Sequence, residues 1–247
     1  MVSISERIHL LELDVVDSTN RLAYDLGFSG AKPWTIVHAL EQTSGRGRRQ
    51  NDWLSPRGNL FLSAILKPIN GLKRWSELSF VISLAVADTV AEVADRSIIG
   101  LKWPNDVLVN NKKISGILLE TGNNVKKESY LVVGVGLNIA HSPTGTRYGA
   151  TCINELISEK SSVKIILPIL IKAMINWYDI WENSGFLEIR KQWLKRAHGL
   201  GKRIEMIGIA PKSQEGIYTG ISKDGRLVLT KDNGEKELVS AGTVTFV

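Results

Sequence analysis

The sequence is poor in the residues that bind metals or form disulfides. Its single cysteine, Cys152, excludes an internal disulfide. The four histidines are too scattered along the chain to suggest a zinc site. A lone cysteine suits a reducing compartment, so we expect a cytoplasmic protein whose activity does not depend on zinc.

Long apolar runs are absent as well. The N-terminus is charged from Glu6 and Arg7 onward, with no long apolar core before them, so we expect no signal peptide. The most apolar later stretch, residues 163–181, is interrupted by Pro168, Lys172 and Asp179. The sequence therefore predicts no membrane contact.

Several common catalytic motifs are missing. There is no Walker A loop, no HExxH helix and no plausible Ser/His/Asp set. The sequence therefore lacks the residues that P-loop enzymes and the common hydrolases use for catalysis. What the predicted loops carry instead are arginines, lysines, amides and an indole. Such groups position reactants and neutralise developing charge, as in the attack of a carboxylate on the α-phosphate of ATP.

The composition describes an ordinary globular protein with a basic balance. At 247 residues and 43% hydrophobic, the chain can bury one large core and a small second one. The net charge of +6 favours anionic partners such as nucleotides, nucleic acid or an acidic protein, without choosing among them.

The central feature is a basic loop, residues 41–53, which follows a strand-like run. Two glycines let its backbone approach a ligand, and three arginines supply planar donors for phosphate or carboxylate: Gly45, Arg46, Gly47, Arg48 and Arg49. Trp53 follows and offers a π-face to a heterocycle. Gln50 stands where a dinucleotide fingerprint needs its third glycine, so a Rossmann fold is excluded.

The element pattern indicates an α+β fold. Residues 1–16 predict at most a short strand pair, and residues 17–20 predict a helix start. A nearly all-apolar helix is expected over 76–94, with Ser76 as its cap. Strands joined by short turns imply antiparallel pairing; we expect them at 34–40, 60–66, 101–109, 114–120 and 130–139.

The C-terminal part changes character near residue 198. Helical patterns fill residues 151–197, whereas 203–247 is a run of short alternating strands separated by Gly-containing turns. We expect one large domain over residues 1–198 and a small β-barrel or sandwich over 199–247.

Five motifs, in this order, resemble those of biotin protein ligases. They are Asp-Ser-Thr-Asn at 17–20, Gln-Thr-Ser-Gly-Arg-Gly-Arg-Arg at 42–49 with Trp53, Lys-Trp-Pro-Asn-Asp at 102–106, Lys-Ile-Ser-Gly-Ile-Leu-Leu-Glu at 113–120 and Gly-Val-Gly-Leu-Asn-Ile at 134–139. Any one block is weak evidence, whereas five in order are very specific.

The resemblance implies a fold and a reaction. The fold is a mixed sheet with flanking helices, like that of class II aminoacyl-tRNA synthetases, followed by an SH3-like C-terminal domain. The large domain over residues 1–198 would then be the catalytic biotin- and ATP-binding domain. Biotin and MgATP would give biotinyl-5′-adenylate and pyrophosphate, and a lysine of a biotin carboxyl carrier protein domain would then take the biotin. The resemblance also makes a homodimer plausible. With no room for a DNA-binding domain before residue 17, we expect no sequence-specific DNA binding.

Site residues follow from the resemblance position by position. Arg48 and Lys113 match the catalytic positions, and Asp106 is a candidate Mg²⁺ ligand. The biotin-binding positions are Ser18, Thr19, Asn20, Gln42, Gly45, Arg46, Gly47, Arg48, Lys113 and Gly116. The positions for ATP or the adenylate are Arg46, Arg48, Trp53, Asn105, Lys113 and Asn138. This sequence departs from the family pattern at Gln50, where the loop usually has a glycine. We expect this difference to affect the rate at which the loop closes, but not its role.

Two alternatives stay open at this stage. A lipoate ligase would use the same adenylation chemistry, although the Gly-Arg-Gly-Arg-Arg and Lys-Trp-Pro-Asn-Asp motifs belong to the biotin pattern. A nucleic-acid-binding module could use the arginine loop, Trp53 and the basic surface, but it leaves the motifs at 17–20 and 113–120 unexplained.

Overall fold

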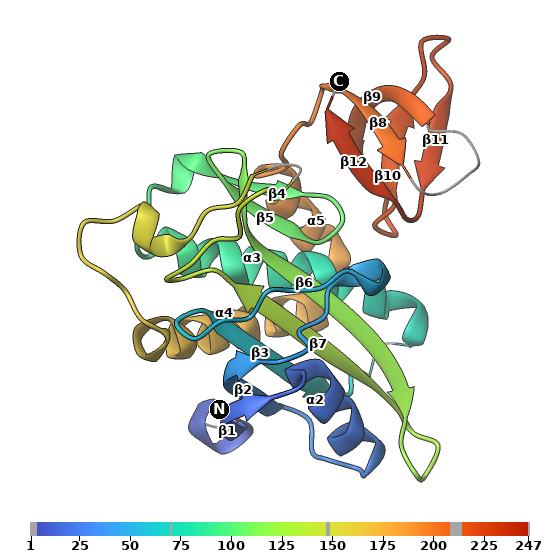
Figure 1. Cartoon of the computed structure of the whole chain (residues 1–247). Helices are drawn as coiled ribbons and strands as arrows, with labels where there is room; N and C mark the ends of the chain where they lie inside the picture. The colour runs from blue at the N-terminus through green and yellow to red at the C-terminus, as the bar shows by residue number, and fades with distance from the viewer. Residues whose placement is uncertain (1–3, 70, 147–148, 208–213, 247) are drawn as a thin grey trace.

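The computed structural model describes residues 4–69, 71–146, 149–207 and 214–246. Residues 208–213 and 247, which belong to the expected C-terminal strand run, lie outside the described residues. A large sheet with helices on both faces carries most of the chain, and a small sheet sits at one end of it (Figure 1). The expected α+β class, with a small C-terminal β domain, is confirmed.

The large sheet has seven strands in the order β1-β2-β3-β7-β6-β5-β4. Their bounds are β1 His9–Val16, β2 Thr35–Gln42, β3 Leu60–Leu66, β4 Ile99–Lys102, β5 Asp106–Val109, β6 Lys112–Asn123 and β7 Ser129–Leu137. Every neighbouring pair is antiparallel except β1 and β2, which run parallel. Residues 1–16 were expected to form at most a short strand pair; of these, residues 4–16 form a short helix, α1 (Ile4–Arg7), and the single strand β1, and residues 1–3 lie outside the described residues.

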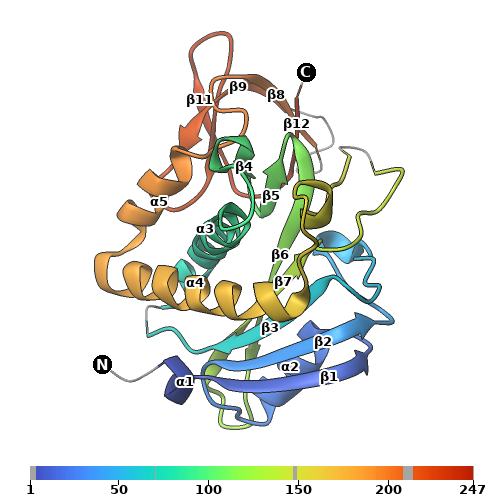
Figure 2. The ribbon, with the colours of Figure 1, turned by 90° about the vertical axis from the view of Figure 1, so that its left-hand side faces the viewer.

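The helices cover the two faces of this sheet unequally. Helix α2 (Thr19–Phe28) connects the parallel pair and lies on one face, against β2, β3, β6 and β7. Helix α3 (Leu78–Ala91) lies on the other face, and α4 (Val163–Ser184) packs against α3, as Figure 2 shows. Helix α5 (Phe186–Leu194) follows, and short 3₁₀ turns lie at Arg48–Gln50, Leu72–Glu77, Arg96–Ile98 and Ile153–Glu155.

Helix α3 is buried almost all round, as its apolar sequence predicts. Its start differs from the prediction, because a 3₁₀ turn over Leu72–Glu77 precedes it and Ser76 does not cap it. Glu77 instead accepts hydrogen bonds from Arg74 and from the indole of Trp181 on α4. This buried carboxylate ties the start of α3 to α4.

The small sheet has five antiparallel strands in the order β11-β10-β9-β8-β12. They are β8 Arg203–Ile207, β9 Gln214–Ile221, β10 Leu227–Thr230, β11 Lys236–Val239 and β12 Thr243–Phe246. Its core residues join the same hydrophobic cluster as α3 and α5. In the described ranges, no helix combines the length and apolarity that crossing a bilayer would need.

Candidate active site

The floor of the site is a bare patch of the large sheet. Along one face of β7, Tyr130 and Val132 pack against α2, and the next two residues on that face are Gly134 and Gly136. Gly136 pairs with Gly116 of β6 in an uninterrupted register, so the glycines do not mark a bulge. Side chains, not a bulge, come close to the backbone here. A Cβ on Gly134 would lie 1.9 Å from Asn20 Oδ1.

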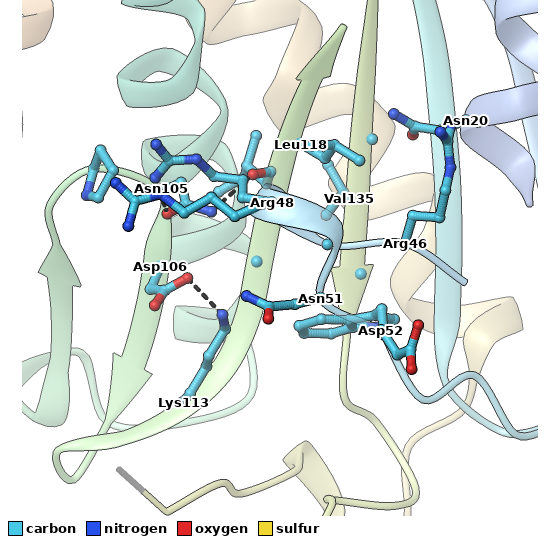
Figure 3. Close-up of a pocket in the computed structure, with 18 of the residues that line it drawn as sticks. Asn20, Arg46, Arg48, Asn51, Asp52, Asn105, Asp106, Lys113, Leu118 and Val135 are labelled. Atoms are coloured by element: carbon cyan, nitrogen blue, oxygen red, sulfur yellow. Dashed lines mark hydrogen bonds and ion pairs between the residues drawn. The ribbon is translucent and has the colours of Figure 1, made fainter. Parts of the chain in front are cut away.

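The basic loop covers this patch and encloses a cavity of about 260 Å³, close to the lower end of small-molecule sites at about 300 Å³. The loop folds back on itself, with a bridge between Arg46 and Asp52. Two carboxylates, Asp52 and Asp106, line the cavity, against five cationic residues: Arg46, Arg48, Arg49, Lys102 and Lys113. The cavity is thus suited to an anionic ligand (Figure 3).

One end of the cavity, at the N-terminus of α2, carries neutral hydroxyl and amide side chains, with the Arg46–Glu120 ion pair beside them. Gln42 Oε1 accepts from the backbone N–H of Thr19 at 2.8 Å and from the Thr19 hydroxyl at 3.0 Å. Ser18 precedes the helix but makes no side-chain cap, and its buried hydroxyl has no hydrogen-bond partner among the described residues. Ser18 and Thr19 therefore offer unused hydroxyl capacity to a ligand.

The other end is charged. Lys113 Nζ lies 2.6 Å from Asp106 Oδ1, and Arg48 donates to Asn105 Oδ1 at 3.0 Å, as the dashed lines in Figure 3 show. Burial lowers the pKa of the Arg48 guanidinium, and the nearby Asp106 charge opposes that shift. These cations are held in place before any ligand arrives, which is the condition for stabilising charge efficiently.

Trp53 forms a wall between the two ends. Its indole lies over Gly136, where a Cβ would approach Nε1 to 2.4 Å, and beside Gly116. The Lys113 ammonium is 5.4 Å from the ring centroid. Like that of Ser18, the buried indole N–H has no hydrogen-bond partner in the described part of the chain. The glycines thus make room for an aromatic ring.

The loop also explains the departure at Gln50. Arg49 and Gln50 have φ values of 57° and 60°. This left-handed region favours glycine and costs another residue about 1–2 kcal/mol. Gln50 therefore carries backbone strain that a glycine at this position would not.

The C-terminal domain reaches the same cavity. Gly242, Thr243 and Val244, at the start of β12, are among the lining residues. The Trp103 indole donates to Gly225 O at 3.1 Å, and Lys102 Nζ lies 5.8 Å from the Phe246 ring. The Lys-Trp-Pro segment is therefore packed against the small sheet.

The structure gathers most of the residues that the sequence selected, with two exceptions. Those lining the cavity are Ser18, Thr19, Asn20, Gln42, Arg46, Gly47, Arg48, Trp53, Asn105, Asp106, Lys113 and Gly116. Asn138 is buried, donates to Thr151 O at 3.1 Å and does not line it. Gly45 does not line it either, and a Cβ there would lie 2.4 Å from Ser55 Oγ. Both support the backbone around the site.

No metal centre is preformed in the described ranges. No group of three or more His, Cys, Asp or Glu residues could hold an ion there. Asp106, the candidate Mg²⁺ ligand, is paired with Lys113. Cys152 is buried, and burial raises the pKa of its thiol.

Some residues at the site were not selected from the sequence. Ser63 is a hydroxyl within the wholly buried strand β3, and a polar residue in such a run is a usable signal. Glu120, the last residue of the fourth motif, accepts from Asn20 and Arg46. The start of β12 carries no local signal, because only the fold brings it to the cavity.

Comparisons with known proteins agree with this geometry. Residues 12–138 match the model of the biotin/lipoate A/B protein ligase family, and residues 199–247 match the biotin protein ligase C-terminal domain. A biotin–[acetyl-CoA-carboxylase] ligase of Paracoccus denitrificans is 34% identical over 93% of this chain and 97% of its own length. The bifunctional ligase/repressor BirA of Bacillus subtilis is 29% identical over 94% of this chain and 73% of its own length.

A solved structure gives the same result. The biotin protein ligase of Aquifex aeolicus, in complex with biotin and ATP, superposes with a TM-score of 0.83 at 27% identity, covering 97% of this chain and 99% of that one. The five motifs occur in the family's order and meet at one cavity, and the similarity covers nearly the full chain. All three observations indicate the same family. The chain belongs to the biotin protein ligases.

Proposed function

We propose that this protein activates biotin with ATP and transfers it to a specific lysine of a biotin carboxyl carrier protein domain. The observation that carries the proposal is a single cavity with a neutral hydroxyl and amide end and a cationic end. Biotin has the same division, with a ureido head and a carboxylate tail. Relatives named as biotin ligases, and a relative's structure with biotin and ATP, support this substrate pair.

The neutral end suits a ureido group. The Thr19 proton is directed to Gln42 Oε1, so the Thr19 oxygen can accept from a ureido N–H. The unpaired hydroxyl of Ser18 can donate to the ureido oxygen. A neutral head that both donates and accepts satisfies groups that would otherwise be buried without partners.

The cationic end suits the first chemical step. A carboxylate oxygen of biotin attacks the α-phosphorus of ATP, a P–O bond forms, and the bond to pyrophosphate breaks. Lys113 and Arg48 neutralise the biotin carboxylate and the α-phosphate as these two anions approach each other. The Trp53 ring keeps water out of the side of the cavity that it covers. No protein nucleophile is needed, which agrees with the missing hydrolase motifs.

The second step needs an open route to the adenylate. The uncharged amine of the acceptor lysine attacks the acyl carbon and an amide C–N bond forms. The bond from that carbon to the AMP oxygen breaks, AMP leaves with the bonding pair, and the proton lost by the amine passes to solvent. The Arg46 side chain is partly exposed, so the basic loop lies between the cavity and solvent. We infer that the loop retains the adenylate until the acceptor lysine arrives.

Mg²⁺ fits the site only as an ion carried by the nucleotide. Mg²⁺ in such enzymes typically takes one or two protein carboxylates together with substrate phosphates and water. Asp106 could supply one carboxylate if it exchanged its partner Lys113, which now lies 2.6 Å away. When bound, the ion would neutralise phosphate charge.

Further expectations from the sequence extend this proposal. We infer a division into residues 1–198 and 199–247, supported by the family match that starts at residue 199. A homodimer through the edge strand β1 is supported by the partly exposed Leu10, Leu11 and Val15. A cytoplasmic location would keep Cys152 reduced.

The test is transfer itself. The protein, biotin and MgATP are incubated with a carrier domain, and its mass is measured. A gain of one biotin on the wild-type carrier, absent from a carrier whose acceptor lysine is replaced by arginine, supports the proposal. An unchanged carrier mass, with both proteins folded, contradicts it.

A further inference from the structure

The carboxylate of Glu120 joins two parts of the site that are far apart in sequence. Its Oε2 accepts from Asn20 Nδ2, on α2, at 2.8 Å and from Arg46 Nη2, in the basic loop, at 3.0 Å. Figure 3 shows the Arg46 side chain extending toward Asn20. One oxygen on β6 therefore holds both the helix that forms the neutral end of the cavity and the loop that covers it.

This carboxylate also fixes how the neighbouring amide is turned. An ionised carboxylate only accepts hydrogen bonds, so Asn20 must present its nitrogen to Glu120 and its oxygen to the other side. There Ser63 donates to Asn20 Oδ1 at 2.6 Å, and Ser63 Oγ also lies 2.8 Å from Thr19 Oγ1. Gly134 leaves the space that the Asn20 amide occupies.

The network continues through the neutral end and returns to the loop. The backbone N–H of Thr19 fixes the oxygen of the Gln42 amide, so the Gln42 nitrogen donates to Ser55 Oγ at 2.8 Å. Ser55 in turn donates to Trp53 O at 2.8 Å. These hydrogen bonds, joined by the 2.8 Å contact between Ser63 and Thr19, connect Arg46 within the basic loop to Trp53 at its end.

We propose that Glu120 is a positioning residue that couples the neutral, head-binding end of the cavity to closure of the basic loop. It does so by orienting Asn20 and by holding Arg46. This inference rests on the proposed function for its ligand, biotin, whereas the coupling itself is a property of the free protein. Glu120 touches neither reacting atom, so its effect is on binding and loop closure.

The chain offers a matched control at the far end of the same hairpin. Glu128 accepts from Asn124 Nδ2 at 2.8 Å and pairs with Lys67 at 3.6 Å, so it too combines an asparagine with a cation. It is remote from the cavity lining. Glu120→Gln and Glu128→Gln therefore remove equivalent charges, but only the first touches the loop.

The first experiment measures loop opening without any ligand. Trypsin cleaves after the loop arginines when the loop opens, and mass spectrometry identifies the site. In Glu120→Gln the amide still offers an oxygen to Asn20 but no charge to Arg46. Loop cleavage should become about fivefold faster, the scale of a partly exposed ion pair. Glu128→Gln should match the wild type. Equal loop cleavage in Glu120→Gln and wild type, including none in either, overturns the coupling.

The second experiment measures biotin binding by calorimetry. Glu120→Ala leaves the Asn20 amide without its acceptor, so biotin affinity should fall about tenfold. Glu120→Gln should lose less affinity, because its amide oxygen can still accept from Asn20. A variant that binds as tightly as the wild type overturns the role of Glu120 at the head-binding end. Failure of the wild type to bind biotin would instead overturn the proposed function, and the proteolysis result would still decide the loop contact.

Discussion

Replacement of Lys113 tests the chemistry of the cationic end. Its ammonium lies 2.6 Å from Asp106, with its side chain one-third exposed, so it is positioned without being sealed from solvent. A preorganised donor of this kind contributes about 3 kcal/mol to a transition state that accumulates negative charge. Lys113→Ala should therefore slow adenylate formation by about two orders of magnitude.

Part of this loss would come from Asp106, which the substitution leaves without its cation beside an incoming phosphate. Lys113→Ala combined with Asp106→Asn should therefore recover about fivefold of the lost rate, since residues in contact are not additive. Lys112, the exposed neighbour whose side chain points to the opposite face of β6, is the control, and Lys112→Ala should change the rate little.

The assay is a single-turnover measurement of adenylate formation at saturating biotin and ATP. Loss of the partly exposed ion pair should cost at most about 1 kcal/mol of folding free energy, or about 2–4 °C in Tm. Melting curves therefore separate misfolding from lost chemistry. Equal rates in Lys113→Ala and Lys112→Ala would refute the assignment of Lys113 to the reaction.

Arg48, Gly136, His38 and the basic surface each allow a further test. Arg48→Ala should release biotinyl-adenylate early, and retention as long as in the wild type, measured by rapid gel filtration, would contradict its role. Gly136→Ala should displace Trp53, because the new Cβ would lie 2.4 Å from the indole, and should shorten the lifetime of the bound adenylate about tenfold. Gly71→Ala is the control, because a Cβ there meets nothing within 4 Å. Burial lowers the pKa of His38 below its ordinary 6.5. The stability that neutral His38 contributes is therefore fully present above pH 6.5 and is lost as the pH falls through the lower pKa of the folded state. The drop in Tm from pH 7.5 to 5.5 should thus be larger in wild type than in His38→Leu, and equal drops would count against this. DNA binding should be weak, sequence-independent and steeply reduced by salt, and a tight sequence-selective complex in a salt titration would disprove that.

Most of the site could be predicted because its residues occur in short segments with their own chemistry. The arginine and glycine loop and the hydroxyl cluster at 17–20 are each unusual in their local sequence, whereas Lys113 was selected over its neighbour Lys112 only by the family resemblance. Gly134 and Gly136 stand out in a strand for the same reason, since a strand loses packing at every glycine. The structure added that Trp53 and Asn20 fill the space those glycines leave.

What could not be predicted depends on distant parts of the chain. Residues 242–244 reach the cavity only because the small sheet packs against Lys102 and Trp103. The parallel pairing of β1 and β2 was missed, although the helix that connects them was predicted, because residues 1–16 were expected to hold at most a strand pair of their own. Asn138, expected near the nucleotide, is buried and donates its amide proton to Thr151 O. Sequence patterns report local chemistry, and these contacts are not local.

The most direct test of the account is exchange of labelled pyrophosphate into ATP, which reports the first step without any acceptor protein. The account predicts exchange that requires biotin and MgATP and is not supported by lipoate. Exchange with lipoate but not with biotin would indicate a lipoate ligase. Exchange with neither acid, from a folded protein, would contradict the assignment of this cavity to biotin activation.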